Sequence, residues 1–252
     1  MTTTHPRTRE PMDRTRKATL AAGLFYIATF VFSIPAAFGL YNNVLDHSSA
    51  FVLGAGSQTP VLWGGLFEII TALTGIGTAV VLYPFIKRHG PAGSIGFVAS
   101  RTLEASMIFL GVVAVIAVCT LRHDYSGAGD VGAMTTTTQA LVAIKNATFL
   151  VGPGIMPVIN ALCFAPILYR ARLVPRIIPI LGIVGAPLLF ASSVAVLFGL
   201  HDQVSASASV LVLPIFFWEL SVGVWMACKG FRSTPVPQQP VVDGPVLAVT
   251  AS

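Results

Sequence analysis

Six long apolar runs dominate the 252-residue sequence, and each is long enough to cross a membrane. A spanning helix needs about 20 mainly apolar residues. The runs lack the alternation of apolar and polar residues that is typical of a membrane β-barrel strand. Only 10% of the residues are charged, against about 25% in a soluble domain. The sequence therefore predicts an all-α polytopic membrane protein, a bundle of six transmembrane helices at Thr19–Tyr41, Val61–Ile86, Ile95–Leu121, Ala147–Tyr169, Ile177–Leu200 and Val210–Cys228.

The membrane-spanning part is expected to form one domain, residues 17–231, between two tails. Residues 1–16 are polar and basic, and residues 232–252 are rich in proline. Neither tail has a hydrophobic period that could build a core, so we predict that both are disordered.

Basic residues are distributed unevenly between the predicted loops. With the N-terminus in the cytoplasm, the inner segments hold twelve Lys and Arg residues, and the outer segments hold two, Arg122 and Lys145. The positive-inside rule therefore predicts that both termini are cytoplasmic. This topology accounts for the net charge of +5, so the expected partner is the lipid bilayer and not nucleic acid.

Four charged residues interrupt the apolar runs: Glu68, Arg101, Glu104 and Glu219. A charge at the bilayer centre costs roughly 2.5–3.5 kcal/mol on insertion scales, so such residues usually face protein or a wet cavity. At a rise of about 1.5 Å per residue, Glu104 lies about 14 Å from the cytoplasmic start of the third run, and Glu219 lies about 14 Å from the outer start of the sixth run. The two residues are therefore expected at a similar level near the middle of the membrane. Arg101 and Glu104 are three residues apart, share a helix face and can pair. Glu68 and Glu219 have no obvious basic partner in the sequence.

The fourth run contains the stretch "VGPGIMPVINALCF", in which Asn160 follows two prolines. Pro153 and Pro157 remove backbone donors and free carbonyls one turn earlier. In lipid those groups must face protein or water. The pattern favours a kinked or broken helix beside Asn160, which suits a polar binding site. The alternative is a kink that serves only packing.

These polar residues support two hypotheses. In the first, the protein is a small transporter or permease-like protein, and a proton, cation or polar substrate binds the candidates Glu68, Arg101, Glu104, Asn160 and Glu219. In the second, it is a structural or regulatory membrane subunit whose buried charges fix helix packing. We identify no catalytic residues, because no nucleophile–base pair is visible, and an enzyme is the weakest interpretation.

Adjacent His and Asp residues occur in each predicted outer loop, at His47, His123 and His201. Three imidazoles that converge would suit zinc or copper, but capping of helix ends explains them as well. All five histidines lie in loops or the N-terminal tail, which argues against a haem bundle. We therefore predict no metal and no cofactor. A small molecule or ion remains the expected ligand, and a homo-oligomer stays open.

Several stretches together resemble a bacterial six-helix membrane family, domain of unknown function 4386. The resemblance runs from about Arg16 to Phe231. The stretches that carry it are "FVLGAG", "GTAVVLYPFIKR", "GFVASRTLEA", "YRARLVPR", "LGIVGAPLLF" and "WELSVGVWMACKGF".

The resemblance implies a protein of the bacterial plasma (inner) membrane. The family pattern includes acidic positions that correspond to Glu68, Glu104 and Glu219, and an arginine that corresponds to Arg101. The three His/Asp pairs are not part of that pattern. The family supplies no established activity, so the resemblance supports the fold and leaves the function to be argued from the site.

Overall fold

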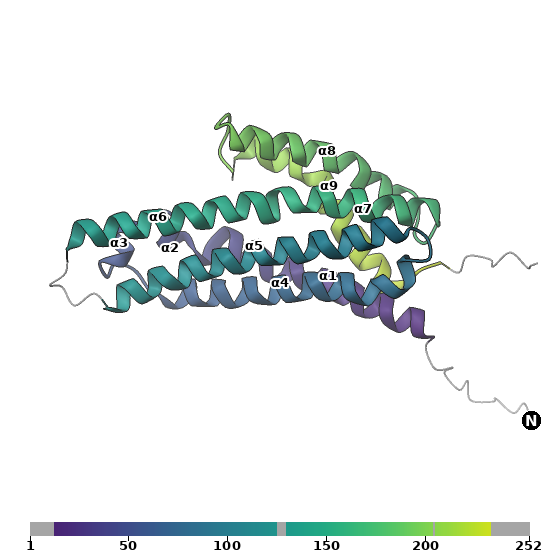
Figure 1. Cartoon of the computed structure of the whole chain (residues 1–252), viewed down its shortest axis with the longest axis horizontal. Coiled ribbons are helices and arrows are strands. Elements are labelled where there is room, and N and C mark those ends of the chain that lie inside the picture. Colours follow the sequence, from purple (N-terminus) through teal and green to yellow (C-terminus); the bar gives the residue numbers. More distant parts are fainter. Residues whose placement is uncertain (1–12, 125–129, 204, 233–252) are drawn as a thin grey trace, which may run out of the picture.

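The structure is a computed structural model that describes residues 13–124, 130–203 and 205–232. Within these residues all regular structure is helical (Figure 1). Two short segments, η1 and η2, are π-helical. The elements in chain order are α1 (Arg14–Pro35), η1 (Ala36–Leu40), α2 (Asn42–Leu45), α3 (Ser48–Val52), α4 (Thr59–Ile86), α5 (Pro91–Asp124), α6 (Val131–Phe149), η2 (Leu150–Ile155), α7 (Met156–Arg170), α8 (Ile177–Leu197) and α9 (Ala206–Cys228).

Six helical stretches of the described chain are long and apolar enough to cross a membrane, which confirms the predicted fold class. The first begins at Arg14, so residues 14–16 of the predicted N-terminal tail are helical. Residues 1–12 and 233–252, the remainder of the two predicted tails, lie outside the described residues. The six stretches are Arg14–Leu40, Thr59–Ile86, Pro91–Asp124, Val131–Arg170, Ile177–Leu197 and Ala208–Cys228.

The fourth helix begins much earlier than the apolar pattern predicts. Asp130 caps it by accepting hydrogen bonds from the backbone N–H groups of Gly132 and Ala133. Two of the threonines that follow donate to backbone carbonyls of the same helix, Thr135 to Val131 and Thr137 to Ala133. The assignment of Lys145 to an outer loop was therefore wrong: it lies inside α6, and 4% of its surface is exposed.

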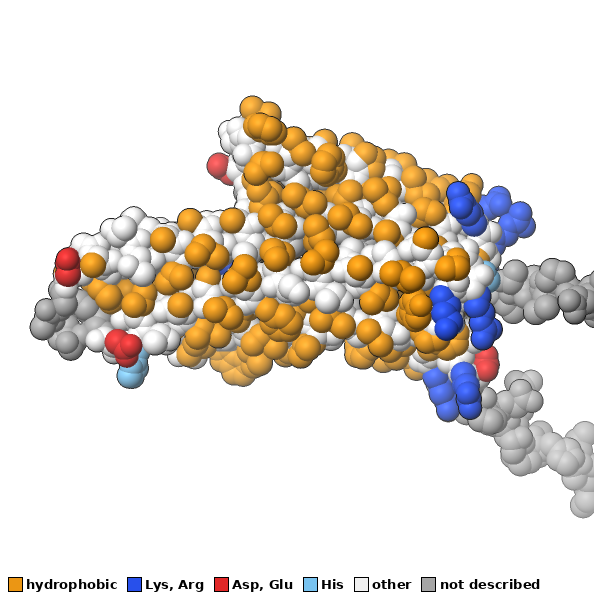
Figure 2. Space-filling model, in the orientation of Figure 1, with side chains coloured by type: hydrophobic (Ala, Val, Ile, Leu, Met, Phe, Trp, Pro, Cys, Tyr) orange, Lys and Arg blue, Asp and Glu red, His pale blue; other side chains and the backbone are white. Residues whose placement is uncertain are grey.

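Charged side chains separate to the two ends of the bundle. Figure 2 shows Lys and Arg gathered at the end near the described start of the chain, whereas Asp side chains lie mainly toward the other end. We call the first the basic end. It includes the turns that carry Lys87, Arg88, Arg170, Arg172, Arg176 and Lys229. Such an asymmetry is typical of a membrane protein with one orientation.

Glycines allow the helices to approach closely. A Cβ atom at Gly185 would lie 2.7 Å from the backbone N of Ile215 in α9, and one at Gly223 would lie 2.7 Å from Cβ of Tyr26 in α1. Gly75 differs, because a Cβ atom there would meet nothing within 4 Å. A Cβ atom would also crowd a neighbouring helix at Gly77 and Gly182, so of these five glycines only Gly75 faces open space.

Arg16 fastens α1 to the end of α9. Its Nη1 donates to the Met226 carbonyl at 2.9 Å, and its Nη2 donates to the Ala227 carbonyl at 2.7 Å. Carbonyls at a helix C-terminus lack intrahelical partners and attract a cation. This contact fixes the position of α1 against α9, the two helices that flank the site described below.

Two matched glycine substitutions test this packing. Gly75→Ala should raise the stability by about 0.5–1 kcal/mol, because alanine lowers the entropic cost of a helix and its methyl group enters open space. Gly185→Ala should lower it by about 1–3 kcal/mol, because the methyl group overpacks against the α9 backbone. Thermal unfolding in mild detergent measures both, and equal shifts would contradict the described packing.

Candidate functional site

Arg101 in α5 lies at the centre of a buried ion cluster. Its Nη1 donates to Oε2 of Glu104 at 3.0 Å, and its Nη2 donates to Oε1 of Glu219 at 2.5 Å. The same Nη2 also donates to the Tyr26 hydroxyl at 3.1 Å. Only 5% of the Arg101 surface is exposed. One guanidinium thus joins α1, α5 and α9, as the planar fork of arginine permits.

Asn160 extends the cluster to a fourth helix. Its Nδ2 donates to Oε2 of Glu104 at 2.7 Å, and its Oδ1 accepts from the Ser100 hydroxyl at 2.5 Å. Asn160 is 2% exposed and Ser100 is 3% exposed. Oε2 of Glu104 thus receives hydrogen bonds from both Arg101 and Asn160, which fixes the orientation of this carboxylate.

The cluster holds one positive and two negative groups. Arg101 is the only basic side chain among the described residues that contacts Glu104 or Glu219. In that part of the chain, Oε1 of Glu104 and Oε2 of Glu219 have no hydrogen-bond partner. With both carboxylates ionised the cluster carries one surplus negative charge, and burial makes an uncompensated charge costly.

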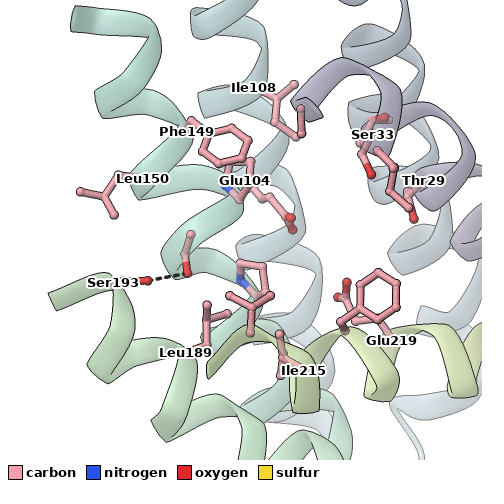
Figure 3. A pocket seen from close by; sticks show the side chains of 18 of the residues that line it. Thr29, Ser33, Glu104, Ile108, Phe149, Leu150, Leu189, Ser193, Ile215 and Glu219 are labelled. Carbon is pink, nitrogen blue, oxygen red and sulfur yellow. Dashed lines mark hydrogen bonds between the residues drawn. The ribbon is translucent and has the colours of Figure 1, made fainter. Parts of the chain in front are cut away.

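A cavity of about 570 Å³ adjoins this cluster and is lined by residues of α1, η1, α4, α5, α6, η2, α7, α8 and α9. In Figure 3 the carboxylates of Glu104 and Glu219 point into the space between these helices, opposite Thr29 and Ser33 of α1. Most of the other lining side chains are apolar. We call this cavity the chamber, and we call its charged end, formed by Arg101, Glu104 and Glu219, the floor.

The lining of the chamber ends toward the basic end at Arg101 of α5 and Glu219 of α9. One turn nearer the basic end lie Phe97 of α5 and Phe164 of α7, whose rings stack with centroids 4.5 Å apart and do not line the chamber. In the other direction the lining continues along α9 as far as Ala208 and along α1 and η1 as far as Phe38. Figure 1 shows the α8–α9 hairpin diverging from α6 in the same direction.

Glu68 belongs to a separate ion pair, which corrects the expectation that it lacks a basic partner. Lys145 Nζ donates to both of its carboxylate oxygens, at 2.5 and 2.7 Å. The Tyr41 hydroxyl donates to Oε2 of Glu68 at 2.8 Å, and Lys145 Nζ lies 4.8 Å from the centre of the Tyr41 ring. This pair is neutral and its groups satisfy one another, although Glu68 also borders the chamber.

The proline-rich stretch distorts the fourth helix without ending it. Residues 150–155 form η2, a π-helical turn between α6 and α7. The Gly154 carbonyl in this turn accepts a hydrogen bond from the Ser193 hydroxyl of α8 at 2.9 Å (Figure 3). π-Helical turns often occur at functional sites. Here the turn lines the chamber and precedes the helix that carries Asn160.

The histidine candidates do not come together. His123 lies 3.4 Å from its neighbour Asp124, and Nδ1 of His201 lies 3.2 Å from the Asp202 carbonyl oxygen. His47 precedes α3. Among the described residues no group of three His, Cys, Asp or Glu side chains is placed to hold a metal ion.

Four residues of the two clusters were missed from the sequence: Tyr26, Tyr41, Ser100 and Lys145. A buried tyrosine usually finds a hydrogen-bond partner, so Tyr26 within an apolar run was a usable signal. Lys145 stands in "LVAIKNATFL", with apolar residues on both sides at helical spacing. That context also indicated a buried lysine.

The family model described as "Domain of unknown function (DUF4386)" matches residues 21–230. The chain belongs to this family. The match covers almost all of the six-helix bundle and includes every residue of the two ion clusters. No curated protein and no solved structure matches the sequence. The DUF4386 protein is a multi-pass membrane protein, and its activity has to be argued from the chamber.

The charge balance of the Arg101 cluster predicts an asymmetric response to mutation. Arg101→Gln leaves two carboxylates close together without a cation, so it should cost about 3–5 kcal/mol of stability. Glu219→Gln leaves a neutral Arg101–Glu104 pair, so its effect should not exceed the roughly 1 kcal/mol of an ordinary hydrogen bond. Thermal unfolding of both variants in detergent checks this, and an equal loss would show that Glu219 is needed for stability.

The Glu68–Lys145 pair should behave as a structural unit. Lys145→Met leaves Glu68 buried without its cation and should cost about 3–5 kcal/mol. The double variant Glu68→Gln, Lys145→Met removes both charges and should lose less than the sum of the two single variants. A double-mutant cycle of unfolding measures the coupling, and additive losses would exclude it.

Proposed function

We propose that the protein is a small transporter that moves a cation or a proton through the chamber, using Glu104 and Glu219. The observation that carries the proposal is the surplus carboxylate at the floor of a chamber inside a membrane bundle. Intramembrane ionisable groups that face a cavity typically mark a substrate or ion pathway. A bound cation or a proton would remove the uncompensated charge.

The shape of the chamber supports alternating access. Its lining extends from Arg101 and Glu219 away from the basic end, and the stacked rings of Phe97 and Phe164 lie between these two residues and the basic end. The positive-inside rule places the basic end in the cytoplasm, in the bacterial plasma membrane that the sequence suggests. In that orientation the described state is open away from the cytoplasm, and the inward-open state would require these two rings to separate.

Each residue of the cluster has a role in this proposal. Arg101 holds the two carboxylates at one level, and Asn160 fixes Glu104. Glu219 has a free oxygen and an 18% exposed side chain, so it is the first contact for an incoming cation. The π-helical turn η2 is a natural point for the fourth helix to bend, because its hydrogen bonding is already irregular.

A flux assay in proteoliposomes tests this function. Vesicles with a preset pH gradient and an internal pH-sensitive dye are challenged with Na⁺, K⁺ or an alkylamine. We expect at least one of them to change the internal pH faster with the wild type than with protein-free vesicles, and Glu219→Gln to abolish the difference.

Gly39→Leu is the matched control, because Gly39 is exposed and a Cβ atom there meets nothing within 4 Å. It should retain the wild-type rate. If no challenge moves protons with the wild type, or if Glu219→Gln is as active as the wild type, the transport proposal fails. The cluster would then be explained by helix packing alone, as expected for a structural or regulatory subunit.

A further inference from the structure

We propose that the chamber binds a monovalent organic cation: an amine or quaternary ammonium group carried on an apolar body. This inference rests on the proposed function, because it names the substrate class of the same site. Its charged head would lie against Glu219 and Glu104. Its apolar part would lie along the walls formed by α1, η2 and α9, on the side of the chamber away from the basic end.

The charge count selects a single positive charge. Two carboxylates face one guanidinium, so one unit of positive charge completes the cluster. The free oxygens, Oε1 of Glu104 and Oε2 of Glu219, are acceptors. A protonated amine can donate a hydrogen bond to them, whereas a quaternary cation is held there by charge attraction alone. A dication would leave the cluster with an excess positive charge in an apolar surrounding.

The free oxygens of the two carboxylates do not by themselves complete the coordination shell of a divalent metal ion. A calcium ion takes 6–8 oxygens and a magnesium ion needs octahedral coordination. One oxygen of each carboxylate is already engaged by Arg101. Two hydroxyl groups that line the chamber already hydrogen-bond to backbone carbonyls: Thr29 donates to the Tyr26 carbonyl, and Ser193 donates to the Gly154 carbonyl.

The walls fit an apolar, preferably bulky, body. Four phenylalanines line the chamber, Phe30, Phe38, Phe149 and Phe216, and the rings of Phe30 and Phe216 meet edge to face with centroids 5.0 Å apart. Aromatic faces attract organic cations. The volume of about 570 Å³ falls in the range of roughly 300–1,000 Å³ that is typical of sites for drug-sized ligands. A proton or a sodium ion would leave this volume unused.

The chamber also reaches the lipid-facing surface. Phe38 of η1 and Leu213 of α9 line it, and they are 65% and 47% exposed. A cation with an apolar body partitions into the membrane, so it can enter between α1 and α9 from the side. An inorganic ion has no such route through hydrocarbon.

Equilibrium binding to the purified full chain in detergent tests this inference, with radiolabelled tetraphenylphosphonium as the probe. We expect saturable binding of one probe per chain, displaced by dodecyltrimethylammonium and unaffected by sodium chloride at a hundredfold higher concentration. Tetraphenylborate, an anion of nearly the same shape, should not compete. Equal binding of the anion would overturn the inference, because it would show that the site selects the shape of the ligand and not its charge.

Three variants connect the binding to the chamber. Glu219→Gln should weaken tetraphenylphosphonium binding at least tenfold, whereas Glu219→Asp should restore part of it. Gly75→Leu should also weaken binding at least tenfold without changing any charge, since position 75 lines the chamber and has free space around it. The matched Gly39→Leu should bind normally. Wild-type affinity in both Glu219→Gln and Gly75→Leu would place the probe elsewhere and refute the proposed site.

The outcome is separable from that of the flux assay. Binding of tetraphenylphosphonium without any flux would support the ligand class and refute transport. Flux of protons or sodium without organic-cation binding would support transport and overturn the ligand class. A size-exclusion profile and an unfolding curve for each variant establish that a loss of binding is not a loss of folding.

Discussion

A guanidinium inside a membrane has to be neutralised, and the arrangement of α1, α5 and α9 follows from this requirement. Arginine does not lose its proton in proteins, so burial at 5% exposure requires carboxylates within hydrogen-bond distance. Glu104 of the same helix balances the charge, and Glu219 of α9 adds a second carboxylate to the same guanidinium. The position of α9 is therefore set by this contact and by the close glycine contact between Gly223 and Tyr26 of α1.

The two ion clusters show two ways of placing charge in lipid. Glu68 and Lys145 form a neutral pair in which Nζ contacts both carboxylate oxygens and Tyr41 adds a further hydrogen bond. Such a pair needs nothing else. The Arg101 cluster is unbalanced by one charge and adjoins a large chamber. This contrast within one protein is the reason that we propose a ligand for the second cluster and none for the first.

The sequence was informative where the local geometry of a helix determines the contact. The pairing of Arg101 with Glu104 follows from a spacing of three residues, and the common depth of Glu104 and Glu219 follows from the helical rise and the predicted topology. The six-helix class follows from the length of the apolar runs. In contrast, the polar threonines after Val131 hid the start of α6 from an apolar pattern. A threonine hydroxyl can donate to a backbone carbonyl of its own helix, so such residues are tolerated in a spanning helix. Lys145 was consequently counted in a loop. The chamber depends on how far α8 and α9 diverge from the other helices, which no periodicity encodes.

The planar fork of Arg101 has a consequence for energy coupling. Its charge is constant, so the occupancy of the floor changes only through the two carboxylates and whatever binds them. A proton on Glu219 and a cation beside it would satisfy the same missing charge, and the presence of one removes the attraction for the other. Two ligands that exclude each other at one site are exchanged and not co-transported. Under the proposed function and orientation, this competition in a membrane with a proton gradient would drive the cation out of the cell as protons enter.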